Sequence, residues 1–183
     1  PRLLQIMNES LADCIERIAA AVSHHPGQHR KEMSELLQQE RYRPLAEGVI
    51  GRAQLREFGP ALYEHLQANS TASTILALGL LRYAPAKDHI SHHCLHDELR
   101  PAATVALALI DPSLTAKVFG WYTSNNPVAG TRIAGVALDE AHSLSGKTLA
   151  KRIYWNLPQP IRFRLKDVPL SRDVRDLIRH DNR

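Results

Sequence analysis

The sequence has few cysteines, few aromatic residues and no long apolar run. Of its 183 residues only Cys14 and Cys94 are cysteines, which is too few for a disulfide scaffold. No stretch approaches 18 uninterrupted apolar residues, so the sequence predicts no membrane-spanning helix. Aromatic residues make up 5% of the chain, which argues against a surface that stacks single-stranded bases.

The N-terminal stretch lacks a basic region followed by an apolar core, so we expect no secretory signal peptide. With only two cysteines, this absence predicts a cytoplasmic protein with free thiols. Hydrophobic residues make up 44% and charged residues 23% of the chain, a balance that excludes a disordered protein. At this length we expect a single globular domain.

Apolar residues recur at three- and four-residue steps along most of the chain, the period of an amphipathic helix. One such stripe begins at Leu3 and ends at Val22. The segments 71–83 and 101–110 are apolar almost all round, and the segment 127–141 is apolar and rich in small residues, so we expect buried helices there. No run alternates with period two, and the predicted fold class is therefore all-α.

Short Ala-Leu motifs recur about every 30 residues. Ala77-Leu78, Ala106-Leu107 and Ala137-Leu138 occupy matching places in three apolar segments. This pattern resembles a HEAT-like repeat of the phycobilisome-lyase type, over about residues 54–141. The resemblance implies pairs of an outer and an inner helix that stack into an α-α superhelix. An ordinary helical bundle, whose alanines allow close helix contact, is the alternative.

The repeat interpretation divides the predicted single domain into three parts. N-terminal capping helices occupy residues 1–53, HEAT-like repeats occupy 54–144, and a capping helix with a basic C-terminal arm occupies 145–183. Within the arm, residues 161–166 alternate apolar and basic side chains, which predicts a short strand or an extended segment. Residues 171–179 are expected to form a short helix.

Basic residues gather at the C-terminal end. The formal net charge of the chain is +4, but residues 147–183 contain ten Lys and Arg against four Asp. Such a segment favours nucleic acid, anionic lipid or an acidic protein partner. It can also be a solvated surface on which the arginines pair with neighbouring aspartates. The candidate nucleic-acid-binding residues are Lys147, Lys151, Arg152, Arg162, Arg164, Arg172, Arg175 and Arg179.

A histidine cluster lies in the polar segment 88–99. In a helix its four imidazoles would share one face and form two i, i+4 pairs, a spacing that can chelate zinc, nickel or copper. The same face could be merely solvated, or sensitive to pH, because neighbouring imidazoles repel once they are protonated. Cys94 lies within the cluster, where imidazoles could activate its thiolate. The candidate metal ligands are His89, His92, His93 and His96.

These patterns favour a non-enzymatic protein-binding adaptor or assembly factor that uses a helical-repeat surface and a basic C-terminal segment. Another protein is the expected partner, and neither a catalytic residue, a cofactor nor a small-molecule substrate is predicted. One alternative is a nucleic-acid-binding protein, and another is a metal-binding protein or metalloenzyme. Because Trp and Tyr dominate interface energetics, the candidate partner-binding residues are Trp121, Tyr122, Tyr154 and Trp155, although each could be a core residue.

Overall fold

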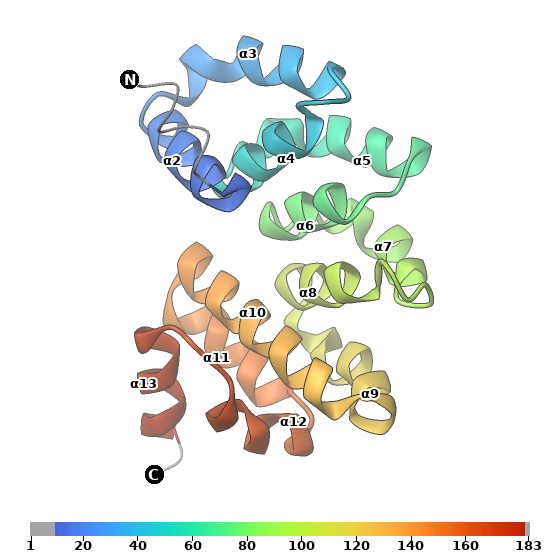
Figure 1. Ribbon diagram of the computed structural model, residues 1–183, viewed down its shortest axis with the longest axis vertical. Helices are drawn as coiled ribbons and strands as arrows, with labels where there is room; N and C mark the ends of the chain where they lie inside the picture. Colours follow the sequence, from blue (N-terminus) through green and yellow to red (C-terminus); the bar gives the residue numbers. More distant parts are fainter. Residues whose placement is uncertain (1–9, 182–183) are drawn as a thin grey trace. The chain divides into compact units, whose positions relative to one another are not determined.

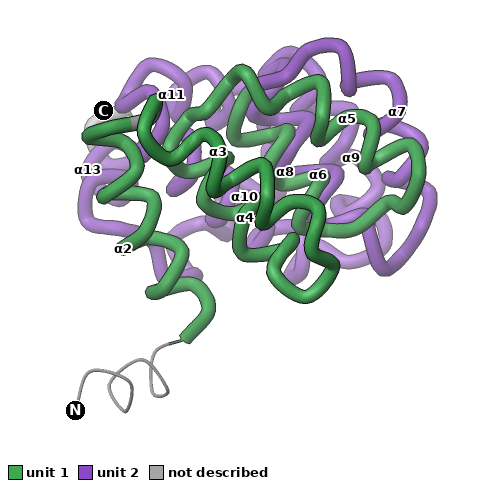
Figure 2. The backbone as a smooth tube through the Cα atoms, turned by 90° about the horizontal axis from the view of Figure 1, so that it is seen from above, with its two compact units in different colours: residues 1–81 green, residues 82–183 purple. Residues whose placement is uncertain are grey.

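The computed structural model describes residues 10–181. This part of the chain folds into twelve α-helices and four short 3₁₀-helices, with no strand (Figure 1). The predicted all-α fold class is confirmed. The chain divides into two compact units, residues 1–81 and residues 82–183 (Figure 2). The boundary falls inside the predicted repeat region 54–144, and the predicted single domain stays a prediction.

The first unit consists of a series of contacting helices and of two helices that pack on that series. Helices α2 (Leu11–His24), α4 (Arg43–Arg52) and α6 (Ala72–Leu80) contact one another in series. Helix α3 (Pro26–Gln38) packs on α4, and α5 (Gly59–Ala68) packs on α6. The core of this unit therefore lies along α4 and α6, which are flanked by the other three helices.

Helix α2 confirms the later part of the predicted N-terminal stripe. Ser10 caps the helix, because its Oγ accepts a hydrogen bond from the Asp13 backbone N–H at 3.2 Å. Ala19 and Val22 are buried on the inner side. The beginning of the stripe, at Leu3, lies outside the described residues.

Helix α4 ends at a break in the chain. An apolar stripe extends across residues 45–58, but the helix stops at Arg52 and Gln54 adopts a positive φ of 57°. The Gln54 side chain stabilises this break, because its Nε2 donates hydrogen bonds to the carbonyls of Gly51 at 2.8 Å and Leu80 at 2.9 Å. A side chain from the break thus joins the ends of α4 and α6.

The second unit begins with two further helix pairs. Helix α7 (Lys87–His93) packs on α8 (Arg100–Ile110), and α9 (Thr115–Asn125) packs on both α8 and α10 (Pro127–Ser145). All residues of α8 from 102 to 109 are buried, which confirms the buried helix predicted over 101–110.

Capping, proline and glycine residues mark the helix boundaries in this unit. Asn126 caps α10 by accepting from the Ala129 backbone N–H at 3.1 Å, and Pro127 is the first helical residue. Gly146, at φ 63°, separates α10 from α11 (Lys147–Asn156), which packs along α10.

The predicted strand or extended segment at residues 161–166 is wrong. The chain forms helix α12 (Gln159–Arg164) and a 3₁₀ turn, and then α13 (Arg172–Asp181). All three contact α10. Ile161 and Leu165 are fully buried four residues apart, which is a helical spacing, whereas Phe163 between them is 67% exposed. The basic segment is therefore helical and packed.

Candidate functional site

A cavity of about 300 Å³ lies among the last three helices of the second unit. Each of these helices supplies part of its wall. We call this feature the C-terminal cavity, and its lining residues are Tyr154, Trp155, Gln159, Arg162, Phe163, Lys166 and Ile178.

Two aromatic side chains beside the C-terminal cavity are exposed to solvent. Trp155 is 52% exposed and Phe163 is 67% exposed, whereas Tyr154 is only 3% exposed. Tyr154 and Trp155 meet edge to face, with ring centres 5.3 Å apart. This contact holds the Trp155 ring beside the cavity. Large exposed aromatic surfaces at a concavity are typical of protein interaction sites.

The C-terminal cavity is also positively charged. The Arg162 guanidinium lies 5.9 Å from the centre of the Tyr154 ring and 5.4 Å from that of Trp155, within cation–π range. Lys166 adds a second positive charge, and none of the lining residues in the described chain is acidic. The site therefore favours a ligand that combines apolar surface with negative charge.

A second concavity, of about 400 Å³, lies on α13 and is lined by Arg172, Arg175, Asp176 and Arg179. We call it the arginine face. Arg175 is oriented by the backbone, because its Nε and one terminal nitrogen donate to the Leu170 carbonyl at 3.3 and 3.0 Å. Within the described residues, Arg172 and Arg179 form no ion pair with an aspartate.

The eight predicted nucleic-acid-binding residues do not all line one concavity. Arg162 belongs to the C-terminal cavity, and three others form the arginine face. The remaining four line neither feature: Lys147, Lys151, Arg152 and Arg164. The structure therefore separates a charged apolar cavity from a nearby cluster of arginines.

The other predicted aromatic pair, on α9, lies in a different environment. Trp121 is 43% exposed, and the Arg100 guanidinium lies 3.7 Å from its ring centre. Tyr122 is 3% exposed, and this burial raises the pKa of its hydroxyl. Each predicted pair thus contains one exposed tryptophan and one buried tyrosine.

The histidine cluster does not form one helical face. Helix α7 ends at His93, and the chain continues through turns over residues 94–99, so His96 lies outside the helix. The predicted helix over 88–99 is to that extent wrong. The ring of His93 still lies 5.4 Å from that of His89 and 5.9 Å from that of His96, centre to centre. No group of three or more His, Cys, Asp or Glu residues in the described chain is arranged to hold a metal ion.

Burial shifts the pKa of two residues of this cluster, His93 and Cys94. Desolvation lowers the pKa of His93, and the neighbouring charges of His89, His96 and His92 lower it further. Burial also raises the pKa of the Cys94 thiol, outweighing the opposing effects of the Arg100 and Lys117 charges. Cys94 is thus held as a neutral thiol, which is the opposite of an activated nucleophile.

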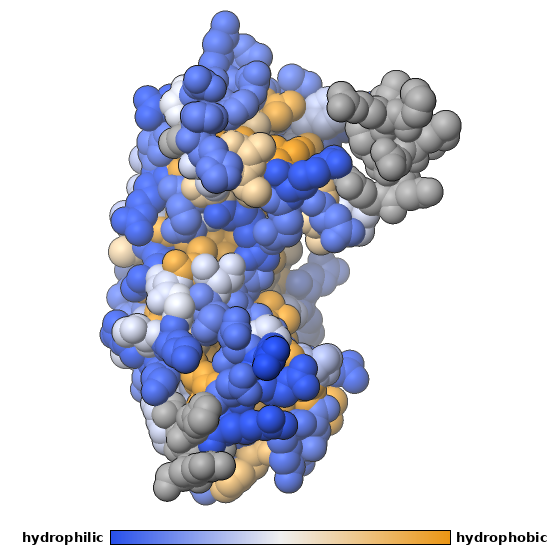
Figure 3. Space-filling view, turned by 90° about the vertical axis from the view of Figure 1, so that its left-hand side faces the viewer, coloured by the Kyte–Doolittle hydropathy of each residue, from blue (hydrophilic) through white to orange (hydrophobic). Residues whose placement is uncertain are grey.

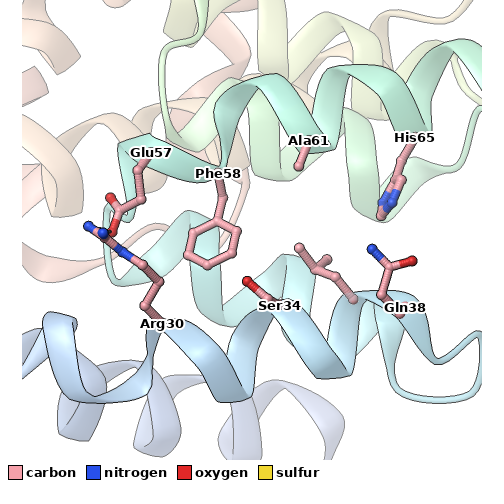
Figure 4. Close-up of a pocket in the computed structure, with 8 residues that line it drawn as sticks. Arg30, Ser34, Gln38, Glu57, Phe58, Ala61 and His65 are labelled. Carbon is pink, nitrogen blue, oxygen red and sulfur yellow. Dashed lines mark hydrogen bonds and ion pairs between the residues drawn. The ribbon is translucent and has the colours of Figure 1, made fainter.

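Sequence reasoning missed a third cavity, of about 360 Å³, between α3 and α5 in the first unit. Arg30 and Glu57 form an ion pair of 3.2 Å at one end, and Phe58 lies at its centre (Figure 4). His65 and Gln38 point toward one another at the other end. No motif connects these residues, since they come from α3, from the 3₁₀-helix Arg56–Phe58 and from α5. Phe163 was also missed, although it is the one aromatic residue of the alternating segment 161–166.

Hydrophilic residues dominate the face of the molecule drawn in Figure 3, and apolar residues appear there in small patches. Among the described helices, none combines the length and the hydropathy needed to cross a membrane. No protein-family model, no curated protein and no solved structure matches this chain.

Proposed function

We propose that the protein is a non-enzymatic adaptor or assembly factor, and that it binds its partner protein through the C-terminal cavity. The observation that carries this proposal is the pair of exposed aromatic side chains, Trp155 and Phe163, beside a cavity that contains Arg162. Exposing aromatic surface costs solvation free energy in the isolated protein, and a partner that covers it recovers that cost.

The occupant of the C-terminal cavity is an acidic peptide segment with one aromatic or large aliphatic side chain. Ile178 and the aromatic rings supply apolar walls for that side chain. Arg162 and Lys166 supply the charge that attracts acidic neighbours on the same segment. The cavity is at the lower end of the size range of ligand pockets, which suits one inserted side chain rather than a whole cofactor.

The proposal includes a HEAT-like arrangement of the helices. The pairs α5–α6, α7–α8 and α9–α10 each pack together, and they correspond to the repeat units that the resemblance implies. Helices α4 and α6 in the first unit, and α8 and α10 in the second, provide contacts between successive inner helices. A continuous superhelix and a cytoplasmic location remain proposals, the latter supported by the free thiols of Cys14 and Cys94.

Nucleic-acid binding is the second candidate function, and the arginine face is the observation that favours it. Phosphate oxygens are natural ligands of clustered guanidinium groups. For the metal-dependent alternative we find no such supporting arrangement among the described residues.

An array of short acidic peptides tests the proposal. Each peptide carries one central residue, which is Phe, Trp, Leu or Ala, and the array is probed with the intact protein. We expect the protein to bind peptides with a central Phe, Trp or Leu, and to bind peptides with a central Ala only weakly. The double variant Trp155→Ala/Phe163→Ala should lose at least about tenfold in affinity, since anchor residues each contribute roughly 1–2 kcal/mol or more.

The matched control is Tyr42→Ala, which removes an aromatic side chain that is 40% exposed in the first unit. This variant should bind the array as the unchanged protein does. Equal signal from the Ala and Phe peptides, or an equal loss in both variants, would contradict docking at the C-terminal cavity.

A further inference from the structure

We propose that the arginine face is a phosphate-binding site, and that it recognises a phosphorylated serine or threonine in the partner segment that the C-terminal cavity anchors. This inference rests on the proposed function and makes it more specific. It assigns the three arginines of α13 a role that is separate from that of Arg162 and Lys166.

The first argument is the chemistry of the arginine face. Arg172, Arg175 and Arg179 follow one another at three- and four-residue spacing, so their side chains leave α13 on the same side. Three guanidinium groups around one concavity can each donate paired N–H groups to phosphate oxygens. Because two of these arginines have no ion pair in the described chain, their charges are available to a ligand.

The second argument is the orientation of the site. The two hydrogen bonds from Arg175 to the Leu170 carbonyl fix its guanidinium before any ligand arrives. The start of α13 is tied to α10, because the Ser171 backbone N–H donates to Asp139 Oδ1 at 3.2 Å. Val174 and Leu177 are buried beneath the helix. A pre-oriented site loses less entropy on binding than three mobile side chains would.

The net positive charge of the arginine face favours a doubly charged anion over a singly charged one. The Asp176 carboxylate lines the same concavity, so an incoming ligand meets one negative charge among three positive ones. A phosphate monoester carries close to two negative charges near neutral pH and three acceptor oxygens. A single carboxylate carries one charge and two acceptor oxygens, so it gains about half as much from the net positive charge of the concavity. The arginine face should therefore discriminate a phosphoserine from an aspartate or glutamate.

Helix α13 joins the two features. Ile178 lines the C-terminal cavity, and at 100° per residue it leaves α13 about 60–120° around the helix axis from the three arginines. The two ligand positions therefore lie on adjoining sides of a helix about 10–12 Å across, roughly 10 Å apart. An extended peptide advances about 3.3 Å per residue, so the phosphorylated residue should lie about three residues from the apolar anchor.

The observations favour a phosphopeptide over a nucleic acid. A nucleic acid gains affinity from many phosphate contacts along its backbone, whereas the two concavities contain only four of the eight predicted basic residues. Stacking of successive bases also needs several exposed aromatic rings, and the cavity exposes two. The test must therefore be able to reveal nucleic-acid binding as well.

The experiment uses fluorescence anisotropy with the intact protein and labelled peptides that contain one central Phe. Serine or phosphoserine is placed at each of about one to five positions from the Phe, on either side. We expect phosphorylation to tighten binding by at least about tenfold, with the largest effect near the third position. Replacing phosphoserine by glutamate should recover only a small part of that gain.

The variant R172K/R175K/R179K keeps every positive charge but removes the guanidinium forks. It should lose most of the gain from phosphorylation and bind the serine peptides unchanged. The charge-neutralising variant R172Q/R175Q/R179Q should lose all of that gain. The matched control is K31A/R41A/R56A, which removes three exposed positive charges from the first unit and should behave as the unchanged protein does.

The outcomes separate this inference from the proposed function. If serine and phosphoserine peptides bind equally through Trp155, the phosphate site is wrong and the docking cavity stands. If no peptide binds, the proposed function fails as well. If a single-stranded RNA or DNA oligonucleotide binds more tightly than every phosphopeptide, with the same dependence on the α13 arginines, the inference is overturned in favour of nucleic acid.

Discussion

The guanidinium of Arg100 lies 3.7 Å from the centre of the Trp121 ring, and the same group binds the turn that precedes it. Its Nε donates to the Cys94 carbonyl at 2.7 Å, and a terminal nitrogen donates to the Leu95 carbonyl at 3.4 Å. The Arg100 side chain is only 11% exposed. One arginine at the start of α8 therefore holds the histidine-rich turn and the exposed tryptophan of α9 together.

Arg100→Ala should destabilise the second unit by about 2.5–4 kcal/mol. It removes a cation–π contact worth roughly 0.5–2 kcal/mol and hydrogen bonds worth about 1 kcal/mol each. Both tryptophans of the chain, Trp121 and Trp155, lie in this unit, so urea unfolding followed by tryptophan fluorescence measures the effect. Arg132→Ala, at an exposed position of α10, is the control. An unchanged midpoint for Arg100→Ala would contradict this role.

The first unit contains a buried carboxylate that joins two helices. Glu47 on α4 is fully buried, and its two oxygens accept hydrogen bonds from the hydroxyls of Ser73 at 2.5 Å and Thr74 at 2.7 Å, both on α6. Glu47→Ala should cost about 2–4 kcal/mol, since it leaves a cavity and removes the acceptor of two hydroxyls.

Hydrogen exchange of the α4 and α6 amides measures this loss. Glu47→Gln keeps the shape of the side chain and should cost less than Glu47→Ala. The companion variant Ser73→Ala/Thr74→Val leaves the carboxylate buried without its donors, and should cost as much as Glu47→Ala or more. Adding Glu47→Ala to that variant should then cost little, because the changes act on one network. Additive losses would show that Glu47 stabilises the unit in another way.

The stability of the second unit should fall as the pH drops below neutral. The pKa of His93 is lower in the folded chain than its ordinary value of 6.5, first because of burial and then because of its neighbouring histidines. The unfolded chain therefore binds a proton more readily than the folded chain. The stabilising contribution is complete above pH 6.5 and is lost as the pH falls toward the folded pKa of His93.

Urea midpoints from tryptophan fluorescence, taken above pH 7 and at about pH 5.5, measure this dependence. His93→Phe keeps a flat ring without a titratable group, so it should flatten the pH dependence. His24→Gln, at an exposed position in the first unit, should leave it unchanged. A pH dependence that persists in full in His93→Phe would assign the effect to other groups.

The sequence predicts most helices well because their signals are local. Asn126 and Pro127 mark the start of α10 through backbone hydrogen bonding and a fixed φ, which need no distant partner. The buried segment of α8 follows from its unbroken apolar composition. Breaks are harder to predict. The end of α4 depends on a bond from Gln54 to Leu80, 26 residues away, which no local pattern contains.

The candidate site is predictable only in part for the same reason. Trp155 and the arginines of α13 stand out by residue type and spacing. The alternation at residues 161–166 indicates a strand, yet the burial of Ile161 and Leu165 against α10 and its neighbours selects a helix and leaves Phe163 exposed. The C-terminal cavity exists only through the packing of three helices, which is a tertiary property.

The most direct test of docking at the C-terminal cavity is a hydrogen–deuterium exchange footprint. The intact protein is compared with and without the tightest aromatic peptide from the array. We predict slower amide exchange confined to α11, α12 and α13, and no footprint in the Trp155→Ala/Phe163→Ala variant. Slower exchange centred on α3 and α5, around the cavity that Phe58 lines, would contradict the account and move the docking site to the first unit.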